Sequence, residues 1–194
     1  MNKRKVDYFV GEGLTDRKAR FLELAENIRR DVPALIELKR EGAYWDFKKQ
    51  WHKDNFELLH DIICLANNLE SEVSYLIIGV DEDADYEVCD VVNNPEVKRR
   101  TNQSLVDLLN SHSWAGPQPP FTTIIPFECG DATIDVVVIV SHREDMPYYL
   151  SKPDGKLKAW MVHTRRSDQN TPIDKGASWS EAEQIWRHHF ALDL

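Results

Sequence analysis

The chain has 194 residues and a formal net charge of −9, with 42% hydrophobic and 29% charged residues. This balance excludes a disordered chain, and the length suits one domain with a sizeable core. An acidic chain also argues against a protein that simply coats nucleic acid, because binding phosphate requires positive charge.

Neither a membrane span nor a secretory signal is predicted. The longest apolar run, residues 134–140, contains Asp135 and is too short to cross a bilayer. The first five residues, MNKRK, do not lead into a long apolar region, so we expect a cytoplasmic location. The three cysteines are widely spaced and odd in number, which argues against a disulfide framework or a zinc site.

The first third of the chain predicts two helices and a strand. A tail over residues 1–13 precedes a helix with Thr15 as its N-cap, and Pro33 is expected to restart a second helix that ends at Gly42. Residues 44–49 then alternate as a strand does. This alternation places Asp46 and Lys48 on one face and the aromatic Trp45 and Phe47 on the other.

The middle and final parts predict helices among mostly antiparallel strands. We expect helices at about 54–69, capped by Asp54 or Asn55, and at 95–113, and a final helix capped by Ser178 or Ser180, with Glu181 three residues after Ser178. Hairpins are expected to pair 76–80 with 86–92 and 121–128 with 133–140. Shorter extended pieces are expected at 146–150 and 160–164. The mixture predicts an α+β fold, with one domain over residues 14–194.

Three carboxylates and one lysine fall at the ends of strand-like segments: Glu41, Asp46, Asp81 and Lys48. Hard divalent cations take oxygen ligands, so a metal-dependent phosphodiesterase would require carboxylates at such positions. The same residues also suit an ordinary edge strand with solvated charges, because an Asp-x-Lys pattern is common.

Basic residues are clustered although the chain is acidic. The clusters are Lys98, Arg99 and Arg100; Lys152, Lys156 and Lys158; and Arg165 with Arg166. Each suits either a surface that follows a phosphate backbone or a solvated face balanced by acids.

Four single residues near the acidic motif have structural and functional interpretations. His52 and His60 are candidate general bases, although lone helix histidines more often serve packing. Asn67 and Asn68 are expected to end their helix in a left-handed conformation, which is a structural role.

Several motifs occur in the order of a known family. Glu41 is followed by Asp46-Phe47-Lys48, then by residues 61–68, which include Ala-Asn, by 75–81 ending in Gly-Val-Asp, and by 163–172. Together, over roughly residues 35–190, they resemble the signature of the Schlafen AlbA-like domain. That family more often has glutamate where Asp46 stands here.

The resemblance implies a Schlafen AlbA-like fold and a metal-dependent endoribonuclease that cleaves structured RNA such as tRNA. Glu41, Asp46 and Asp81 would hold Mg²⁺ or Mn²⁺, and Lys48 would stabilise the charge developing on the phosphate. Arg165 and Arg166, in the closing motif, would bind nucleic acid. The cluster Lys98, Arg99 and Arg100 is a further candidate for that contact because of its charge.

A second function stays open, since proteins with this domain are often labelled as ATP-binding or as transcriptional regulators. The alternative is a non-catalytic module that binds nucleic acid or a nucleotide. The chain has no Gly-x-x-x-x-Gly-Lys-Ser/Thr phosphate loop, which argues against nucleotide hydrolysis.

A homodimer is also expected. Schlafen proteins resemble two such domains arranged as a clamp around RNA, whereas this chain has room for one. A two-fold dimer would bring two basic faces together, with residues 179–190 and 146–150 as candidate contacts. Both segments suit the core of a monomer equally well.

Overall fold

The computed structural model describes residues 14–192, so the predicted tail over 1–13 lies outside the described residues. The elements in chain order are α1 (Leu14–Glu37), β1 (Trp45–Lys48), α2 (Asn55–Ala66), β2 (Val73–Ile78), β3 (Val80–Asp81), β4 (Glu87–Val88), α3 (Asn102–Ser111), β5 (Phe121–Cys129), β6 (Ala132–Val140), β7 (Arg165–Arg166), β8 (Gln169–Asn170) and α4 (Trp179–His189). They confirm the α+β prediction.

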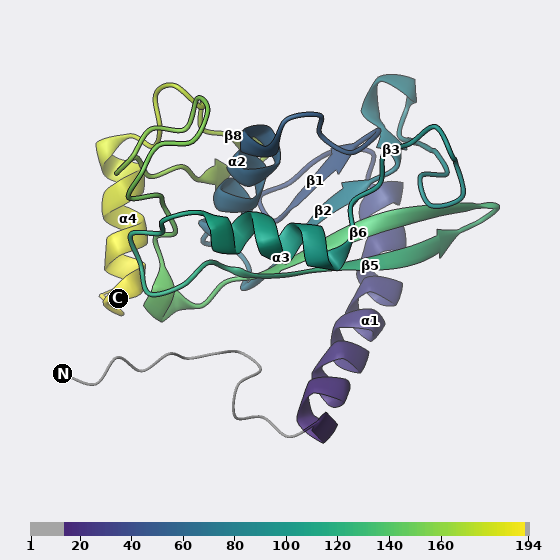
Figure 1. Ribbon diagram of the computed structural model, residues 1–194, viewed down its shortest axis with the longest axis horizontal. Helices are drawn as coiled ribbons and strands as arrows, with labels where there is room; N and C mark the ends of the chain where they lie inside the picture. Colours follow the sequence, from purple (N-terminus) through teal and green to yellow (C-terminus); the bar gives the residue numbers. More distant parts are fainter. Residues whose placement is uncertain (1–13, 193–194) are drawn as a thin grey trace.

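A four-stranded sheet in the order β1-β2-β6-β5 lies at the centre of the molecule (Figure 1). Strands β1 and β2 are parallel, and the other two pairs are antiparallel. The β5–β6 hairpin predicted from the sequence is confirmed. The predicted pairing of 76–80 with 86–92 is wrong for most of its length, because residues 73–78 form β2, which pairs with β1 and β6. Only Val80 and Asp81, in β3, pair with β4.

The sheet carries a separate hydrophobic cluster on each face. Buried residues of α1 pack with Trp45 and Phe47 on one face, whereas α2 and α3 cover the other, where Leu76 and Val137 lie (Figure 1). Trp45 and Phe47 thus anchor β1 on the side of α1. The predicted alternation of β1 is confirmed, and it directs Asp46 and Lys48 toward α2.

The prediction of two N-terminal helices is wrong, because α1 is one helix from Leu14 to Glu37 with Pro33 inside it. Pro33 lies about one turn from the helix end, so its missing N–H removes only one hydrogen bond near a terminus. Val32 and Leu35 are buried on either side of it. Their packing keeps the last turn helical.

Other boundaries differ for local reasons. Helix α3 begins at Asn102 rather than near residue 95, because Thr101 and Ser104 form a capping box there. Neither Asn67 nor Asn68 is left-handed, so that prediction is wrong. Residues 161–164 form no strand, and the short strand β7 starts only at Arg165.

Two capping predictions are confirmed. Ser178 and Glu181 form the capping box that begins α4. Asp54 is the N-cap of α2, although its side chain makes no capping hydrogen bond.

Candidate functional site

The candidate site lies at the end of β1, on the sheet face that α2 covers. Lys48 reaches toward this helix, with its Nζ 4.0 Å from Oδ2 of Asp61 on α2. Glu41 precedes β1, and its Oε1 accepts a hydrogen bond of 3.1 Å from the backbone N–H of Phe47. The sequence motif is therefore folded back on itself, which brings Glu41 beside the strand.

Arg165 holds the two carboxylates of this motif together. Its Nη2 lies 2.7 Å from Oε2 of Glu41 and 3.4 Å from Oδ1 of Asp46. Its Nε donates to the carbonyl of Gly42, and its Nη1 donates to Oδ1 of Asn170. The side chain is only 2% exposed. Arg165, predicted to contact nucleic acid, is thus placed facing inward, where it fixes Glu41 and Asp46.

Lys48 is the cation of the site that solvent can reach. Its Nζ donates to Oδ2 of Asp46 at 2.7 Å, while 32% of its side chain remains exposed. Burial alone would lower the pKa of Lys48, but the nearby Asp46 and Asp61 carboxylates raise it. The ammonium therefore stays charged, and it also donates to the carbonyl of Phe47 at 3.1 Å.

Asp61, the first residue of the family-like motif 61–68, completes the site. Its carboxylate lies 2.8 Å from Nε2 of His52 and accepts a 2.8 Å hydrogen bond from Nδ2 of Asn170. Because Asn170 also accepts from Arg165, the contacts close into a loop. We call these residues the charged cluster: Glu41, Asp46, Lys48, Asp61, Arg165 and Asn170.

The charged cluster contains three carboxylates but only two permanent cations. Burial, followed by the hydrogen bond and negative charge of Asp46, raises the pKa of Glu41 to about 8. Burial also disfavours the charge on Asp46, but Glu41, Lys48 and Arg165 together lower the pKa of that carboxyl group. The surplus negative charge is therefore relieved by a proton on Glu41.

Asp81, the third predicted metal ligand, is directed elsewhere. Its Oδ2 lies 2.6 Å from Nζ of Lys49, and this contact lowers the pKa of the Asp81 carboxyl group. Within residues 14–192, no group of three or more His, Cys, Asp or Glu side chains is arranged to hold a metal ion. The structure thus joins Glu41 with Asp46 and leaves Asp81 paired with a neighbouring lysine.

The other predicted basic residues differ in their surroundings. Arg99 makes two hydrogen bonds of 2.7 Å to the buried carboxylate of Asp135, which gives it a structural partner. Arg100 donates to the carbonyl of His52 at 3.5 Å, whereas Lys98 is exposed. Arg166 is also exposed, and its Nη2 donates to Oε1 of Gln184 on α4.

The two candidate histidines surround Asp61 rather than the Glu41–Asp46 pair. His52 contacts Oδ2 of Asp61, while Nδ1 of His60 lies 3.9 Å from Oδ1. The Nε2 of His60 is 3.0 Å from the carbonyl of Thr171, and its ring packs edge-on against His163. The carbonyl contact and the ring packing favour the packing role for His60, whereas His52 is hydrogen-bonded to a carboxylate of the charged cluster.

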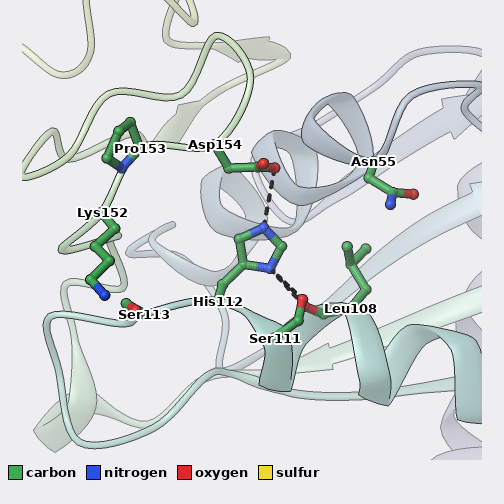
Figure 2. A pocket seen from close by; sticks show the side chains of 8 residues that line it. All are labelled: Asn55, Leu108, Ser111, His112, Ser113, Lys152, Pro153 and Asp154. Carbon is green, nitrogen blue, oxygen red and sulfur yellow. Dashed lines mark hydrogen bonds and ion pairs between the residues drawn. The ribbon is translucent and has the colours of Figure 1, made fainter.

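A pocket of about 400 Å³ lies between the start of α2, the end of α3 and the loop 152–154 (Figure 2). It places Ser111, His112 and Asp154 in a row that resembles a catalytic triad. However, Nδ1 of His112 lies 2.6 Å from the carbonyl of Leu108, which can only accept, so Nδ1 must carry a proton. It cannot take one from Ser111, whose hydroxyl donates to the same carbonyl.

The fold and the charged cluster define an α+β domain with a carboxylate–lysine site on one face of its sheet. The family described as Schlafen, AlbA_2 matches residues 41–174, and the chain belongs to this family. The match includes the whole charged cluster and Asp81, whereas α1 and α4 lie outside it. The family suggests a function related to nucleic acid.

Comparison with curated proteins and comparison with solved structures both give no match. Among the described residues, no helix has the length and apolar character that a membrane crossing requires.

Proposed function

We propose that the chain is an endoribonuclease that hydrolyses phosphodiester bonds of structured RNA at the charged cluster, with Mg²⁺ or Mn²⁺ as its cofactor. The observation that carries this proposal is the surplus of one carboxylate beside a partly exposed lysine. Glu41 holds a proton beside the ionised Asp46, and a divalent cation bound between the two carboxyl groups would take the place of that proton. Membership of the Schlafen AlbA_2 family supports a nucleic-acid substrate.

The residues fit a divalent cation in part. Glu41 and Asp46 offer adjacent carboxylate oxygens, which are the ligands that Mg²⁺ and Mn²⁺ prefer. Asp81 would have to exchange Lys49 for the cation to complete the predicted set. When bound, the cation would supply Lewis acidity at the phosphate.

The residues themselves have distinct roles in this proposal. Lys48 donates from Nζ to a phosphate oxygen and stabilises the negative charge that develops there, as a partly exposed ammonium can. Arg165 is too buried to contact RNA, so it keeps Glu41 and Asp46 in place. Asp61 positions Lys48 directly and Arg165 through Asn170.

A cleavage assay on a folded tRNA, with and without EDTA, tests the proposal. We expect wild-type protein with Mn²⁺ to cut the RNA, and EDTA, Glu41→Gln or Asp81→Asn to stop the cutting. Glu57→Gln, at an exposed acid in the first turn of α2, is the matched control and should cut normally. Undiminished cleavage in chelator would rule out the metal-dependent reaction.

The alternative is a nucleic-acid-binding module without catalysis. It is favoured by one observation, namely that both cations of the charged cluster already have carboxylate partners. Wild-type protein that binds RNA and cuts neither RNA nor DNA in Mn²⁺ would establish this alternative.

A further inference from the structure

His52 lies in the loop after β1, beside the charged cluster. Its side chain is only 8% exposed, and its neighbour Trp51 is buried in the core on the side of α2. The backbone carbonyl of His52 accepts a hydrogen bond of 3.5 Å from Nη2 of Arg100. The imidazole is therefore held at a fixed place next to Asp61.

The hydrogen-bond pattern gives this imidazole one task, which is donation to Asp61. A carboxylate oxygen only accepts, so Nε2 of His52 carries the proton in its 2.8 Å contact with Oδ2 of Asp61. The other nitrogen, Nδ1, is buried and has no hydrogen-bond partner among the residues that the structure describes. A buried Nδ1 is out of reach of a substrate proton, which argues against His52 as a general base.

Lys48 has a donor that Asp61 does not use. The ammonium has three hydrogens, and it donates to Oδ2 of Asp46 at 2.7 Å and to the carbonyl of Phe47 at 3.1 Å. Its Nζ lies 4.0 Å from Oδ2 of Asp61, which is too far for a hydrogen bond but close enough for the charges to attract. Within residues 14–192, these contacts leave one N–H of Lys48 for a further acceptor.

Without His52, Asp61 would itself become that acceptor. Oδ1 of Asp61 accepts from Asn170, so the loss of His52 leaves only Oδ2 without a donor. Asp61 is 7% exposed, and a buried carboxylate oxygen without a donor is costly. A shift of about 1 Å would bring Oδ2 to the ~2.8 Å of a charge-assisted hydrogen bond with Lys48.

We propose that His52 is a positioning residue of the charged cluster. Its hydrogen bond keeps Asp61 away from Lys48, so that one N–H of Lys48 stays available to a phosphate oxygen of the substrate. From 4.0 Å, the Asp61 carboxylate still favours the charged form of Lys48 without occupying this donor. The inference rests on the proposed function for the role of Lys48, and it gives His52 a task that involves no proton transfer.

Crystal structures of two His52 variants test the geometry without a cleavage assay. His52→Phe fills the space of the ring but cannot donate, so we expect Oδ2 of Asp61 to move to about 2.8 Å from Nζ of Lys48. In His52→Gln, the amide nitrogen is separated from Cα by as many bonds as Nε2 of the imidazole. It can donate in the same place, and Asp61 should stay at 4.0 Å.

Initial rates on a folded tRNA in Mn²⁺ provide the functional readout. His52→Phe should lower kcat roughly 10- to 100-fold, as the loss of an outer partner commonly does, with KM little changed. His52→Gln should retain most of the wild-type kcat, although glutamine cannot act as a base. In an Asp61→Asn background, His52→Phe should cause no further loss, because His52 acts only through the Asp61 carboxylate.

His163→Phe is the matched control, at a second buried histidine. His163 is 1% exposed, and neither of its ring nitrogens has a hydrogen-bond partner within the described part of the chain. Because this change removes no hydrogen bond, the distance from Asp61 to Lys48 and the kcat per folded molecule should be unchanged. Thermal unfolding of each variant, followed by circular dichroism, measures the folded fraction.

Three results would overturn the inference. They are an unchanged distance from Asp61 to Lys48 in His52→Phe, equal losses of kcat in His52→Phe and His52→Gln, and the same loss from His52→Phe whether residue 61 is aspartate or asparagine. If the wild type cuts no RNA, the nuclease proposal fails, and the crystal structures alone decide the inference.

Discussion

Two buried aspartates on the same face of the central sheet have opposite surroundings. Asp46 on β1 and Asp135 on β6 are both inaccessible to solvent, and the register places them two strands apart. Asp135 accepts two hydrogen bonds from Arg99 and one from the indole of Trp51. Asp46 shares its cations with Glu41 and Asp61.

The difference separates a structural ion pair from a candidate site. One guanidinium neutralises one carboxylate at Asp135, so nothing further is needed there. Around Asp46, three carboxylates meet two permanent cations, and the surplus is met by a raised pKa on Glu41. A carboxyl group whose pKa is raised this far is more common at functional sites than elsewhere.

The largest expected effect is the difference in RNA cleavage rate between the variants that replace these two aspartates. Asp46→Asn should lower the RNA cleavage rate by about 100-fold or more, because the reacting centre loses a charged group. Asp135→Asn should leave the rate per folded molecule unchanged. Initial rates in Mn²⁺, normalised to the folded fraction, provide the comparison. Equal losses in both variants would show that Asp46 acts through the fold alone.

The two arginines should differ in their effect on stability. Arg165→Met should cost about 3–5 kcal/mol in the free energy of unfolding, since it leaves buried carboxylates without their cation. Arg99→Met should cost less, about 1–3 kcal/mol, because 34% of the Arg99 side chain is exposed and water can replace it. Urea unfolding measures both. A larger loss for Arg99 would contradict this ranking.

Stability should depend on pH through Glu41. Its pKa is raised from 4.5 to about 8, so the folded state holds a proton that the unfolded state releases. The resulting stabilisation is complete below about pH 4.5 and declines as the pH rises to about 8, by roughly 1–2 kcal/mol after allowance for solvent screening.

Urea unfolding at pH values between 5 and 8 tests this dependence. Glu41→Gln should remove the contribution of Glu41 to the decline, whereas Glu57→Gln should retain it. If the free energy of unfolding depends on pH in both variants as it does in the wild type, Glu41 does not hold the surplus proton.

The smallest effect concerns a charge at the edge of the site. Arg166→Gln should weaken RNA binding severalfold and reduce the slope of log affinity against log salt by about 1, because one phosphate contact is lost. Lys98→Gln is the comparison, since Lys98 is exposed and belongs to a different predicted cluster. Salt-titrated affinities distinguish the two. If the slope of log affinity against log salt is the same in Arg166→Gln as in the wild type, the Arg166 guanidinium contacts Gln184 and no phosphate.

Patterns within a short stretch of sequence predicted much of the fold. The alternation of residues 44–49 identified which side of β1 carries Asp46 and Lys48, because a strand repeats every two residues. The capping box at Ser178 similarly located the start of α4. Pro33 misled the prediction of α1, since its effect depends on tertiary packing near the helix end.

The arrangement of the site depends on contacts between residues far apart in the sequence, which local sequence patterns do not reveal. Asp61 and Asn170 are 109 residues apart, yet they share a hydrogen bond. Arg165 was noted as basic, but its burial arises only when the closing motif packs against Gly42. Likewise, no spacing rule could indicate that Asp81 would meet Lys49. Charge alone does not predict burial, which the whole fold determines.

A crystal structure of the protein soaked in Mn²⁺ tests the functional assignment of the charged cluster most directly. Anomalous scattering should show a cation at the carboxylates of Glu41 and Asp46, with Asp81 turned from Lys49 toward it. Asp135 should remain bound to Arg99 with no cation beside it. Absence of a peak at Glu41 and Asp46, in crystals whose protein cuts RNA when redissolved in Mn²⁺, would contradict the account.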